Sequence, residues 1–418
     1  MKNRINETIK KIKKHNKGYF SFLNKNKKFN LMEVIALMII TVIFGMFTGG
    51  LLMYRKGTIN FGLRRELREF ADTYTEILNE YYTDVDESGL LEAGINGMVS
   101  FLGDPYSVFM DSDTTTAFNE KVNGEYVGIG TEIIQYQDMK VEIKEVYETG
   151  PAYKAGLRQG DIIIKVDDKD VKEKSLTEIS SLVKGKEGTT VKITVLRSDE
   201  EHEFIVKRQS IDIESVKSEI IEYNEKKVGY ITIDLFAANT DEQFKKHLDS
   251  LEQEKIDSLI IDVRGNSGGY LTTVSNILEL FLKKDDMIYQ LKTKGKVEKF
   301  YDKTDEHRTY KVAVLVNGGS ASASELLTAC MKDTYGAYTI GTVTYGKSKV
   351  QKTQGLSNGR SIKFTFQEWL TPKGESVGEK GIEPEYVVTY EASDIDNEYD
   401  SQQKKALDLL TGKVEEGN

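Results

Sequence analysis

One uncharged stretch near the N-terminus sets the first constraint on this chain. Residues 34–53, VIALMIITVIFGMFTGGLLM, contain no charged side chain. A helix of about 20 residues crosses the roughly 30 Å of hydrocarbon in a bilayer. The apolar region of a cleaved signal peptide is shorter, about 7–15 residues, and ends in an A-x-A-like site, which this stretch lacks. The pattern therefore predicts an uncleaved transmembrane helix over residues 31–54.

The residues before this helix are strongly basic. Residues 1–30 hold ten Lys or Arg against one acid, Glu7. By the positive-inside rule such a tail stays in the cytoplasm, and everything after Met53 is exported. We therefore expect a single-pass protein of the cytoplasmic membrane whose larger part is extracytoplasmic.

The exported part is acidic. The chain has 57 Lys and Arg and 67 Asp and Glu, and without residues 1–30 this becomes 47 against 66, a formal net charge of −19. Such a surface repels polyanions, so we expect no nucleic acid partner. The single cysteine, Cys330, excludes an intramolecular disulfide, and the four scattered histidines form no zinc cluster. We expect no metal and no other cofactor.

At 418 residues the chain is too long for one ordinary core, so two or three domains are expected. Residues 66–118 show the three–four spacing of a helical segment, which closes in the turn-like LGDPYSVFMD. Residues 125–209 hold short β-rich runs, with one short helix expected at 176–183.

From Val228 onward, strands and helices alternate. The expected strands are VGYITIDL, SLIIDVR and VAVLVN, and the expected helices cover residues 241–252 and 321–332. This alternation predicts an α/β core whose parallel strands are buried by helices.

Residues 341–348 match the pattern of a phosphate-binding loop, G-x-x-x-x-G-K-S. Such a loop must lead into a helix, whose first N–H groups face the anion. The residues that follow, SKVQKTQGLSNGR, hold one apolar side chain before Gly355, so no amphipathic helix begins there. We therefore expect no nucleotide. An extracytoplasmic nucleotide hydrolase stays as an alternative, which thermal stabilisation by ATP would reveal.

The segment NGGSASASELLTAC, residues 317–330, places Ser322 at the start of an apolar helix. Ser322 and Glu325 fit the S-x-x-E capping box, which explains them without any chemistry. The position also suits a nucleophile, because free N–H groups at a helix start can stabilise an oxyanion. The base is then either His307, in a polar run, or Lys347, whose pKa burial would lower. A plain surface lysine is the alternative for Lys347.

These residues carry a family resemblance. GSASASE, followed by YGKSKVQ with Lys347 placed 25 residues after Ser322, resembles the signature of the C-terminal processing peptidases, also called tail-specific proteases. The resemblance implies Ser322 as nucleophile, Lys347 as general base and Gln351 as the residue that orients the lysine. Ser348-Lys349 stands where the family usually has Gly-Thr, and Lys349 could alter the local field.

A glycine-rich segment supports the resemblance. DVRGNSGGYL, residues 262–271, resembles the family's segment that supplies one oxyanion N–H, here implied for Gly268 with Gly269 close behind. The Ala323 N–H is the second implied donor. A bare strand-to-helix turn is the alternative explanation for the two glycines.

The β-rich region resembles a PDZ domain, on YVGIG (126–130) and GPAYKAGLRQGDIIIKVDD. The resemblance implies that the N–H groups of Val127, Gly128 and Ile129 capture the carboxylate of a peptide C-terminus. A glycine-rich hairpin is the alternative. LGDPYSVFM is similar to the family's motif after its N-terminal helices, so the resemblance covers nearly the whole exported part.

We therefore expect a multidomain α+β protein with a peptidase core similar to the Clp protease/crotonase fold. The expected domains are a basic tail (1–30), a transmembrane helix (31–54), a helical segment (60–120), a PDZ domain (121–210), a serine peptidase core (211–390) and a C-terminal tail with one helix (391–418).

We expect the chain to be a membrane-anchored serine endopeptidase that cleaves proteins with accessible apolar C-termini. The alternative is a catalytically silent PDZ scaffold on a peptidase fold. The resemblance implies a PDZ domain that can gate the site and dimers built through terminal segments. A homodimer and a regulatory partner at the PDZ domain are compatible with the sequence, which identifies neither.

Overall fold

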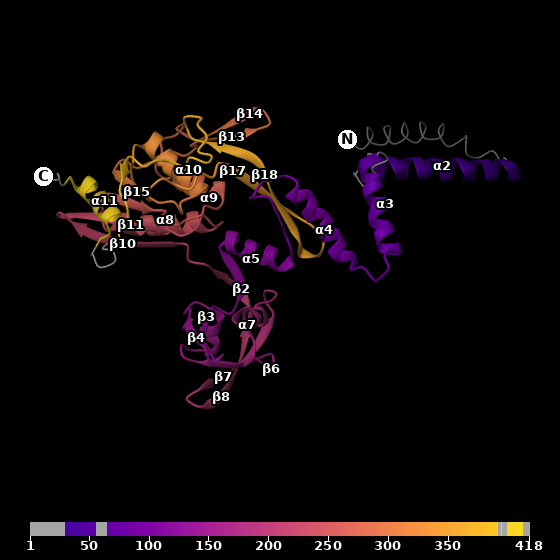
Figure 1. The fold of residues 1–418 in the computed structure, drawn as a ribbon, viewed down its shortest axis with the longest axis horizontal. Coiled ribbons are helices and arrows are strands. Elements are labelled where there is room, and N and C mark those ends of the chain that lie inside the picture. The colour runs from indigo at the N-terminus through magenta and orange to yellow at the C-terminus, as the bar shows by residue number, and fades with distance from the viewer. Residues whose placement is uncertain (1–29, 56–64, 392–393, 395–398, 413–418) are drawn as a thin grey trace, which may run out of the picture. The chain divides into compact units, whose positions relative to one another are not determined.

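The structure of the chain is a computed structural model that describes residues 30–55, 65–391, 394 and 399–412. The predicted basic tail therefore lies outside the described residues, apart from its last residue. The chain divides into two compact units, residues 1–92 and 93–418. Figure 1 follows the elements along the chain by colour.

The first unit contains α2 (Leu31–Arg55), α3 (Arg65–Glu80) and the start of α4 (Glu87–Ser100). Within α2, residues 31–49 form a 19-residue stretch of mean hydropathy 2.3 with none of it buried. By length and composition this stretch is a candidate membrane span, in agreement with the prediction from the sequence.

The expected helical run over residues 66–118 is interrupted. After α4 come a short strand, β1 (Val108–Met110), and then α5 (Ser112–Asn123). Strand β1 pairs antiparallel with β18 (Ser361–Leu370). Because the pairing partner is so distant in sequence, the local pattern does not reveal this strand.

The PDZ region lies between the two-stranded pair β2 and β9 and has its own hydrophobic core, which includes Ile143, Ile179 and Val195. Its main sheet has the order β3-β4-β5-β7-β8, with β6 beside β5. The expected helix is α7, but a second short helix, α6, was not expected. The elements are β2 (Glu125–Gly128), β3 (Thr131–Gln135), β4 (Val141–Val146), α6 (Pro151–Ala155), β5 (Ile162–Val166), β6 (Lys169–Asp170), α7 (Leu176–Val183), β7 (Thr190–Arg197), β8 (Glu200–Lys207) and β9 (Gln209–Asp212).

The central sheet of the peptidase core has the order β10-β11-β12-β15-β16-β19. All neighbours are parallel except β10 and β11, which form an antiparallel hairpin. The α/β core predicted from the alternation is therefore confirmed. Its elements are β10 (Val216–Tyr223), β11 (Lys226–Ile233), α8 (Thr240–Gln253), β12 (Ser258–Asp262), α9 (Leu271–Leu278), β15 (Lys311–Val316), α10 (Ala323–Cys330), a π-helical turn (Met331–Tyr335), β16 (Tyr338–Gly341), β19 (Tyr386–Val387) and α11 (Ser401–Thr411).

The two faces of this sheet are buried by different helices. Alternate residues of a strand point to opposite faces. In β12, Leu259 and Ile261 pack with residues of α8, α9 and α10, whereas Ile260 packs with Leu407 and Leu410 of α11. The C-terminal helix α11 is thus part of the core, as its place beside β11 and β15 in Figure 1 shows.

A second, antiparallel sheet was not anticipated. Strand β18 is the central strand of this sheet and pairs with β1, β13 and β17. Strand β13 pairs in turn with β14. The remaining elements are β13 (Met287–Thr293), β14 (Lys296–Tyr301), β17 (Lys349–Gly355) and a 3₁₀ turn (Ser357–Gly359). Strand β17 begins two residues after Lys347, so a strand and not a helix follows the G-x-x-x-x-G-K-S pattern.

Candidate active site

Ser322 is the residue immediately before α10, and its backbone is in an unusual conformation. Its φ is 54° and its ψ is −110°, a region that a non-glycine residue rarely occupies. Backbone strain of this kind costs on the order of 1–3 kcal/mol and clusters at functional sites. The serine is buried, and the helix begins at Ala323, two residues later than expected.

The carboxylate of Glu325 joins the segments that carry Ser322 and Lys347. It is fully buried, and one oxygen, Oε2, accepts hydrogen bonds from the backbone N–H groups of Ser322 and Lys347, each at 2.8 Å. The other oxygen, Oε1, accepts from Thr344 Oγ1 at 2.6 Å and from the Gly346 N–H at 2.7 Å. The sequence pattern revealed Glu325 only as a helix cap. Its link to Lys347 appears only in three dimensions.

The backbone of Lys347 is fixed on both sides. Its N–H donates to Glu325, and its carbonyl accepts from the indole N–H of Trp369 at 2.9 Å. Trp369 is fully buried in the core cluster. The position from which the lysine side chain leaves the backbone is therefore set by rigid elements.

The Lys347 side chain is partly buried and its pKa is lowered. Burial is the largest cause, because it disfavours the ammonium form, and the positive charge of Lys363 adds to it. Glu325 and Asp104 act in the opposite direction. The amine lies 4.9 Å from the centre of the Tyr106 ring. A lowered lysine pKa is what a general base requires.

The predicted catalytic side chains do not form a hydrogen-bonded chain. Within the described residues, no hydrogen bond connects the side chains of Ser322, Lys347 and Gln351. The Gln351 amide instead donates to the Lys349 carbonyl at 3.0 Å and to Thr365 Oγ1 at 3.3 Å. A β-bulge between Val350 and Gln351 shifts the register at this point. The role of Gln351 stays a prediction.

The two residues after Lys347, where the chain departs from the expected pattern, both lie near the carboxylate of Glu368. Ser348 is buried and donates from its hydroxyl to Glu368 at 3.3 Å. Lys349 is exposed and lies 3.9 Å from the same carboxylate. The extra positive charge is therefore paired with an acid.

Gly268 packs directly against Ser322. A Cβ atom on Gly268 would lie 2.8 Å from the Ala321 carbonyl oxygen, 2.9 Å from the Ser322 Cβ and 3.1 Å from the Ala323 nitrogen. Its φ of 108° also favours glycine. The glycine-rich segment is therefore more than a bare turn, since it reaches the predicted nucleophile.

The N–H groups around Ser322 differ in what they bind. The Gly268 N–H already donates to Asn266 Oδ1 at 2.8 Å, so it is not free in this structure. In the described part of the chain, the N–H groups of Gly269 and Ala323 have no acceptor. The predicted role of the Gly268 N–H as an oxyanion donor would therefore require it to leave Asn266 first.

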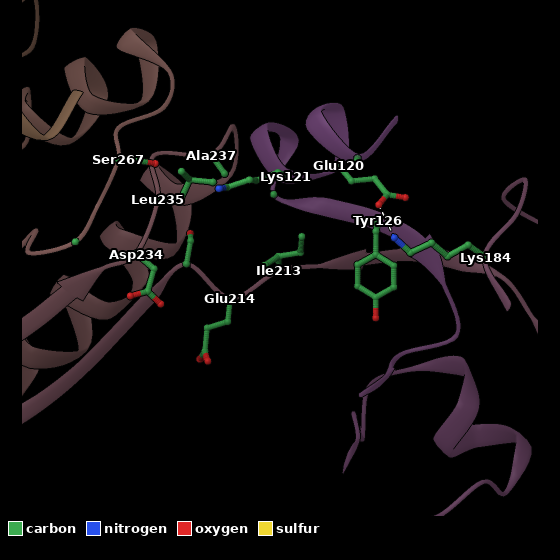
Figure 2. Close-up of a pocket in the computed structure, with 14 residues that line it drawn as sticks. Glu120, Lys121, Tyr126, Lys184, Ile213, Glu214, Asp234, Leu235, Ala237 and Ser267 are labelled. Atoms are coloured by element: carbon green, nitrogen blue, oxygen red, sulfur yellow. Dashed lines mark hydrogen bonds and ion pairs between the residues drawn. The ribbon is translucent and has the colours of Figure 1, made fainter. Parts of the chain in front are cut away.

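A pocket of about 440 Å³ opens beside the glycine-rich segment. Figure 2 shows Glu120, Tyr126 and Lys184 at one end, and Asp234, Leu235 and Ser267 at the other. The pocket therefore extends from the PDZ region to the loop that leads to Gly268.

The predicted carboxylate-binding loop lines a small groove in the PDZ region. A pocket of about 50 Å³ is lined by Gly128 and Ile129 of this loop, by Ile133 of β3 and by Val183 of α7. Val127 lines a larger, open neighbouring pocket instead. A groove between a strand and a helix is the usual place for an added peptide strand.

Other chemistries find less support in the geometry. His307 is exposed, and its ring nitrogen lies 3.5 Å from the carbonyl of Asp305 in its own loop. Within the described residues, no group of three or more His, Cys, Asp or Glu side chains could hold a metal ion.

Comparisons with known proteins agree with this division of the chain. The model described as "Peptidase family S41" matches residues 227–388, and the one described as "PDZ domain" matches residues 142–197. A third, "Activating protease CtpB N-terminal domain", matches residues 54–114. The chain is a serine-type peptidase that carries a PDZ domain.

Curated relatives extend the match over most of the chain. A probable CtpA-like serine protease of Staphylococcus haemolyticus is 36% identical over 373 residues, which cover 87% of this chain and 73% of that protein. The carboxy-terminal processing protease CtpB of Bacillus subtilis is 38% identical over 323 residues, 77% and 67% of the two chains. The chain belongs to peptidase family S41, the C-terminal processing peptidases.

Among solved structures, the photosystem II D1 C-terminal processing protease matches with a TM-score of 0.46 and 23% identity. The match covers 77% of this chain and 86% of that one.

Proposed function

We propose that this peptidase is anchored in the cytoplasmic membrane and uses a Ser322–Lys347 dyad to cleave extracytoplasmic proteins selected by their C-terminal residues. The observation that carries the dyad is the shared carboxylate of Glu325, which binds the backbone of both residues at 2.8 Å. A single buried group thereby links the backbone of the proposed nucleophile to that of the proposed base.

The chemistry follows from the protonation state of the lysine. Neutral Lys347 accepts the proton of Ser322 while the serine oxygen attacks the scissile carbonyl. The resulting ammonium gives this proton to the leaving amine as the C–N bond breaks, which leaves an acyl-enzyme. Lys347 then takes a proton from the water that attacks the ester, and returns this proton to the Ser322 oxygen as the ester C–O bond breaks.

The tetrahedral oxyanion needs hydrogen-bond donors that are in place before the reaction. The Ala323 N–H at the start of α10 and the N–H of Gly269 are available, and Gly268 becomes a third candidate if Asn266 releases it. Gln351 would have to turn from Thr365 toward Lys347 to orient the amine. This rotation of Gln351 is the change that would convert the described arrangement into the proposed active one.

Substrate selection is assigned to the PDZ domain. The groove between β3 and α7 has an apolar lining that includes Ile129, Ile133 and Val183, which favours apolar C-terminal residues. The pocket between Tyr126 and Ser267 gives a bound chain a path toward the glycine-rich segment. Helix α2 supplies the anchor, and the basic residues before it favour export of the catalytic part.

The test is cleavage of an unstructured reporter protein by the full-length chain in detergent, with products identified by mass spectrometry. Reporters ending in Ala-Ala and Asp-Asp are compared for the wild type, Ser322→Ala and Lys347→Met. Ser100→Ala and Lys352→Met, both at exposed positions, serve as controls. We expect cleavage of the Ala-Ala reporter, lost only in the two dyad variants.

Two outcomes would contradict the proposal. Retained cleavage in Lys347→Met would exclude the lysine as the base. No cleavage by any form, together with no labelling of Ser322 by a serine-directed covalent probe, would favour the silent PDZ scaffold instead.

A further inference from the structure

The Lys347 amine has an aromatic partner from a distant part of the chain. Its Nζ lies 4.9 Å from the centre of the Tyr106 ring, within the range of a cation–π interaction. In the described residues this amine has no hydrogen bond and no ion pair. Among the described residues, the ring face is therefore the partner of the ammonium.

Tyr106 is held in place by a rigid local structure. Its N–H donates to Asp104 Oδ1 at 3.1 Å, and the other oxygen of Asp104 accepts from Ser107 Oγ at 2.5 Å. The same Ser107 hydroxyl oxygen accepts from the Thr365 N–H of β18 at 3.1 Å. Two residues beyond Tyr106 begins β1, which pairs with β18. The ring is thus presented by the antiparallel sheet and not by a free loop.

Among the described residues, neither nearby carboxylate forms an ion pair with Lys347. Both oxygens of Glu325 are taken by backbone and hydroxyl donors. Asp104 is occupied by Ser107 and by the Tyr106 N–H. An ion pair would keep the lysine protonated, whereas a ring attracts the cation more weakly and a neutral amine hardly at all.

The other charged and titratable groups around this pair are positive or neutral. Lys363 on β18 faces Lys347 and has a lowered pKa because of burial, and its own amine lies 4.9 Å from the Phe118 ring. The positive charge of Lys349 favours the ionised form of Asp104. Burial, followed by the interaction with Tyr345, raises the pKa of the Tyr106 hydroxyl, which therefore stays a neutral phenol.

We propose that Tyr106 is a positioning residue for Lys347, whose ring face holds the protonated amine at rest and releases the neutral amine to Ser322. The proposal rests on the function assigned above. It makes the "LGDPYSVFM" segment part of the active site, where the sequence indicated the end of a helical region and a resemblance to a family motif without a role.

The test is the pH dependence of kcat/KM of the full-length chain, because its acid limb reports the base in the free enzyme. Tyr106→Phe keeps the ring face, and Tyr106→Leu removes it while leaving an apolar cover. We expect the midpoint of the acid limb to fall by about half a pH unit in Tyr106→Leu and to stay unchanged in Tyr106→Phe. An unchanged or raised midpoint in Tyr106→Leu would overturn the proposal, as would an equal fall in both variants.

A second measurement does not depend on turnover. In the Ser322→Ala background, the rate at which an amine-acylating reagent modifies Lys347 is measured against pH by mass spectrometry, with exposed Lys352 as internal reference. The same fall of the Lys347 midpoint is expected for Tyr106→Leu. If Tyr106→Leu does not melt cooperatively, Tyr106→Met takes its place.

The two measurements separate the two proposals. Reporter cleavage that survives in Lys347→Met contradicts the proposed function, while the labelling still tests the ring. If cleavage is lost in Lys347→Met but the pH midpoint of Lys347 labelling is the same in Tyr106→Leu as with tyrosine, only the positioning role of Tyr106 is contradicted.

Discussion

The carboxylate oxygen Oε2 of Glu325 binds the N–H of Ser322 and the N–H of Lys347 at the same distance, 2.8 Å. The proposed nucleophile and the proposed base come from different elements, the start of α10 and the loop before β17. Among the described residues, no other side chain is hydrogen-bonded to the backbones of both Ser322 and Lys347. This buried carboxylate therefore links the two segments, in addition to the backbone hydrogen bond from the Tyr345 N–H to the Ser320 carbonyl at 3.0 Å.

We expect Glu325→Gln to reduce kcat about 10- to 100-fold and to lower the free energy of unfolding by about 3 kcal/mol. The amide keeps one acceptor oxygen, but its NH₂ group faces donors that then lose their acceptor, and a buried unpaired donor costs about 1–3 kcal/mol. Reporter cleavage and urea denaturation measure the two effects. Glu298→Gln, at an exposed position of β14, is the control. Full activity in Glu325→Gln would show that the shared carboxylate is dispensable.

Gly268 offers a second test of the site. We expect Gly268→Ala to lower kcat/KM by at least 100-fold, because the new Cβ would meet the Ala321 carbonyl and the Ser322 Cβ at under 3.0 Å. Reporter cleavage measures the loss. Gly295→Ala is the matched control, since Gly295 also has a positive φ, 87°, but has no atom within 4 Å of the added Cβ. Equal losses in both variants would mean that backbone strain, not the contact with Ser322, is responsible.

The sequence revealed those features that rest on local periodicity. The parallel strands β11, β12 and β15 and helices α7 and α8 appeared as expected, because alternation and three–four spacing are properties of short windows. The second, antiparallel sheet was not predicted from the sequence. Strand β1 is three residues long, and its pairing with β18 depends on contacts between distant segments.

The same distinction applies to the site. Ser322 and Lys347 were predicted because each lies in a recognisable motif, and the proposed chemistry requires particular residue types. Tyr106 was missed, since nothing in its own segment indicates that its ring lies against a lysine. The bond between Asn266 and the Gly268 N–H could not be foreseen either, because it depends on the exact turn of the loop.

The docking of the C-terminal helix leads to a further prediction. Arg264, within the glycine-rich segment, binds Asp262 at 2.7 Å, Asp400 at 2.8 Å and Gln402 at 3.0 Å. Asp400 also caps α11 by accepting from the Gln403 N–H. Asn is an equally good cap, so Asp400→Asn weakens the link to Arg264 and preserves the helix start.

We expect amide hydrogen exchange in α11 to become about 10-fold faster in Asp400→Asn, because a charge-assisted hydrogen bond is replaced by a neutral one. Mass spectrometry of peptides that cover Ser401–Thr411 measures this exchange. Asp249→Asn, which alters an exposed pair with Lys245, is the control. Unchanged protection of α11 would mean that packing of its apolar side chains alone holds the helix.

Finally, Lys347→Met should abolish cleavage and stabilise the fold at neutral pH. Burial lowers the pKa of Lys347, so the folded protein binds this proton less tightly than the unfolded chain does. Below the lowered pKa, the cost of burying the ammonium is fully present. Between the lowered pKa and the ordinary lysine value the unfolded state holds more protons, so wild-type stability rises with pH and the cost disappears.

Methionine carries no such cost at any pH. We expect the free energy of unfolding of Lys347→Met at pH 7 to be higher than that of the wild type by roughly 0.5–2 kcal/mol, the gain that stabilising substitutions commonly yield. The advantage should shrink as the pH approaches about 10.4, the ordinary lysine pKa. Urea denaturation at pH 7 and at pH 9.5 measures the difference, with Lys352→Met as the exposed control on β17. An advantage that is the same at both pH values would mean that the packing of methionine, and not the lost charge, stabilises the variant.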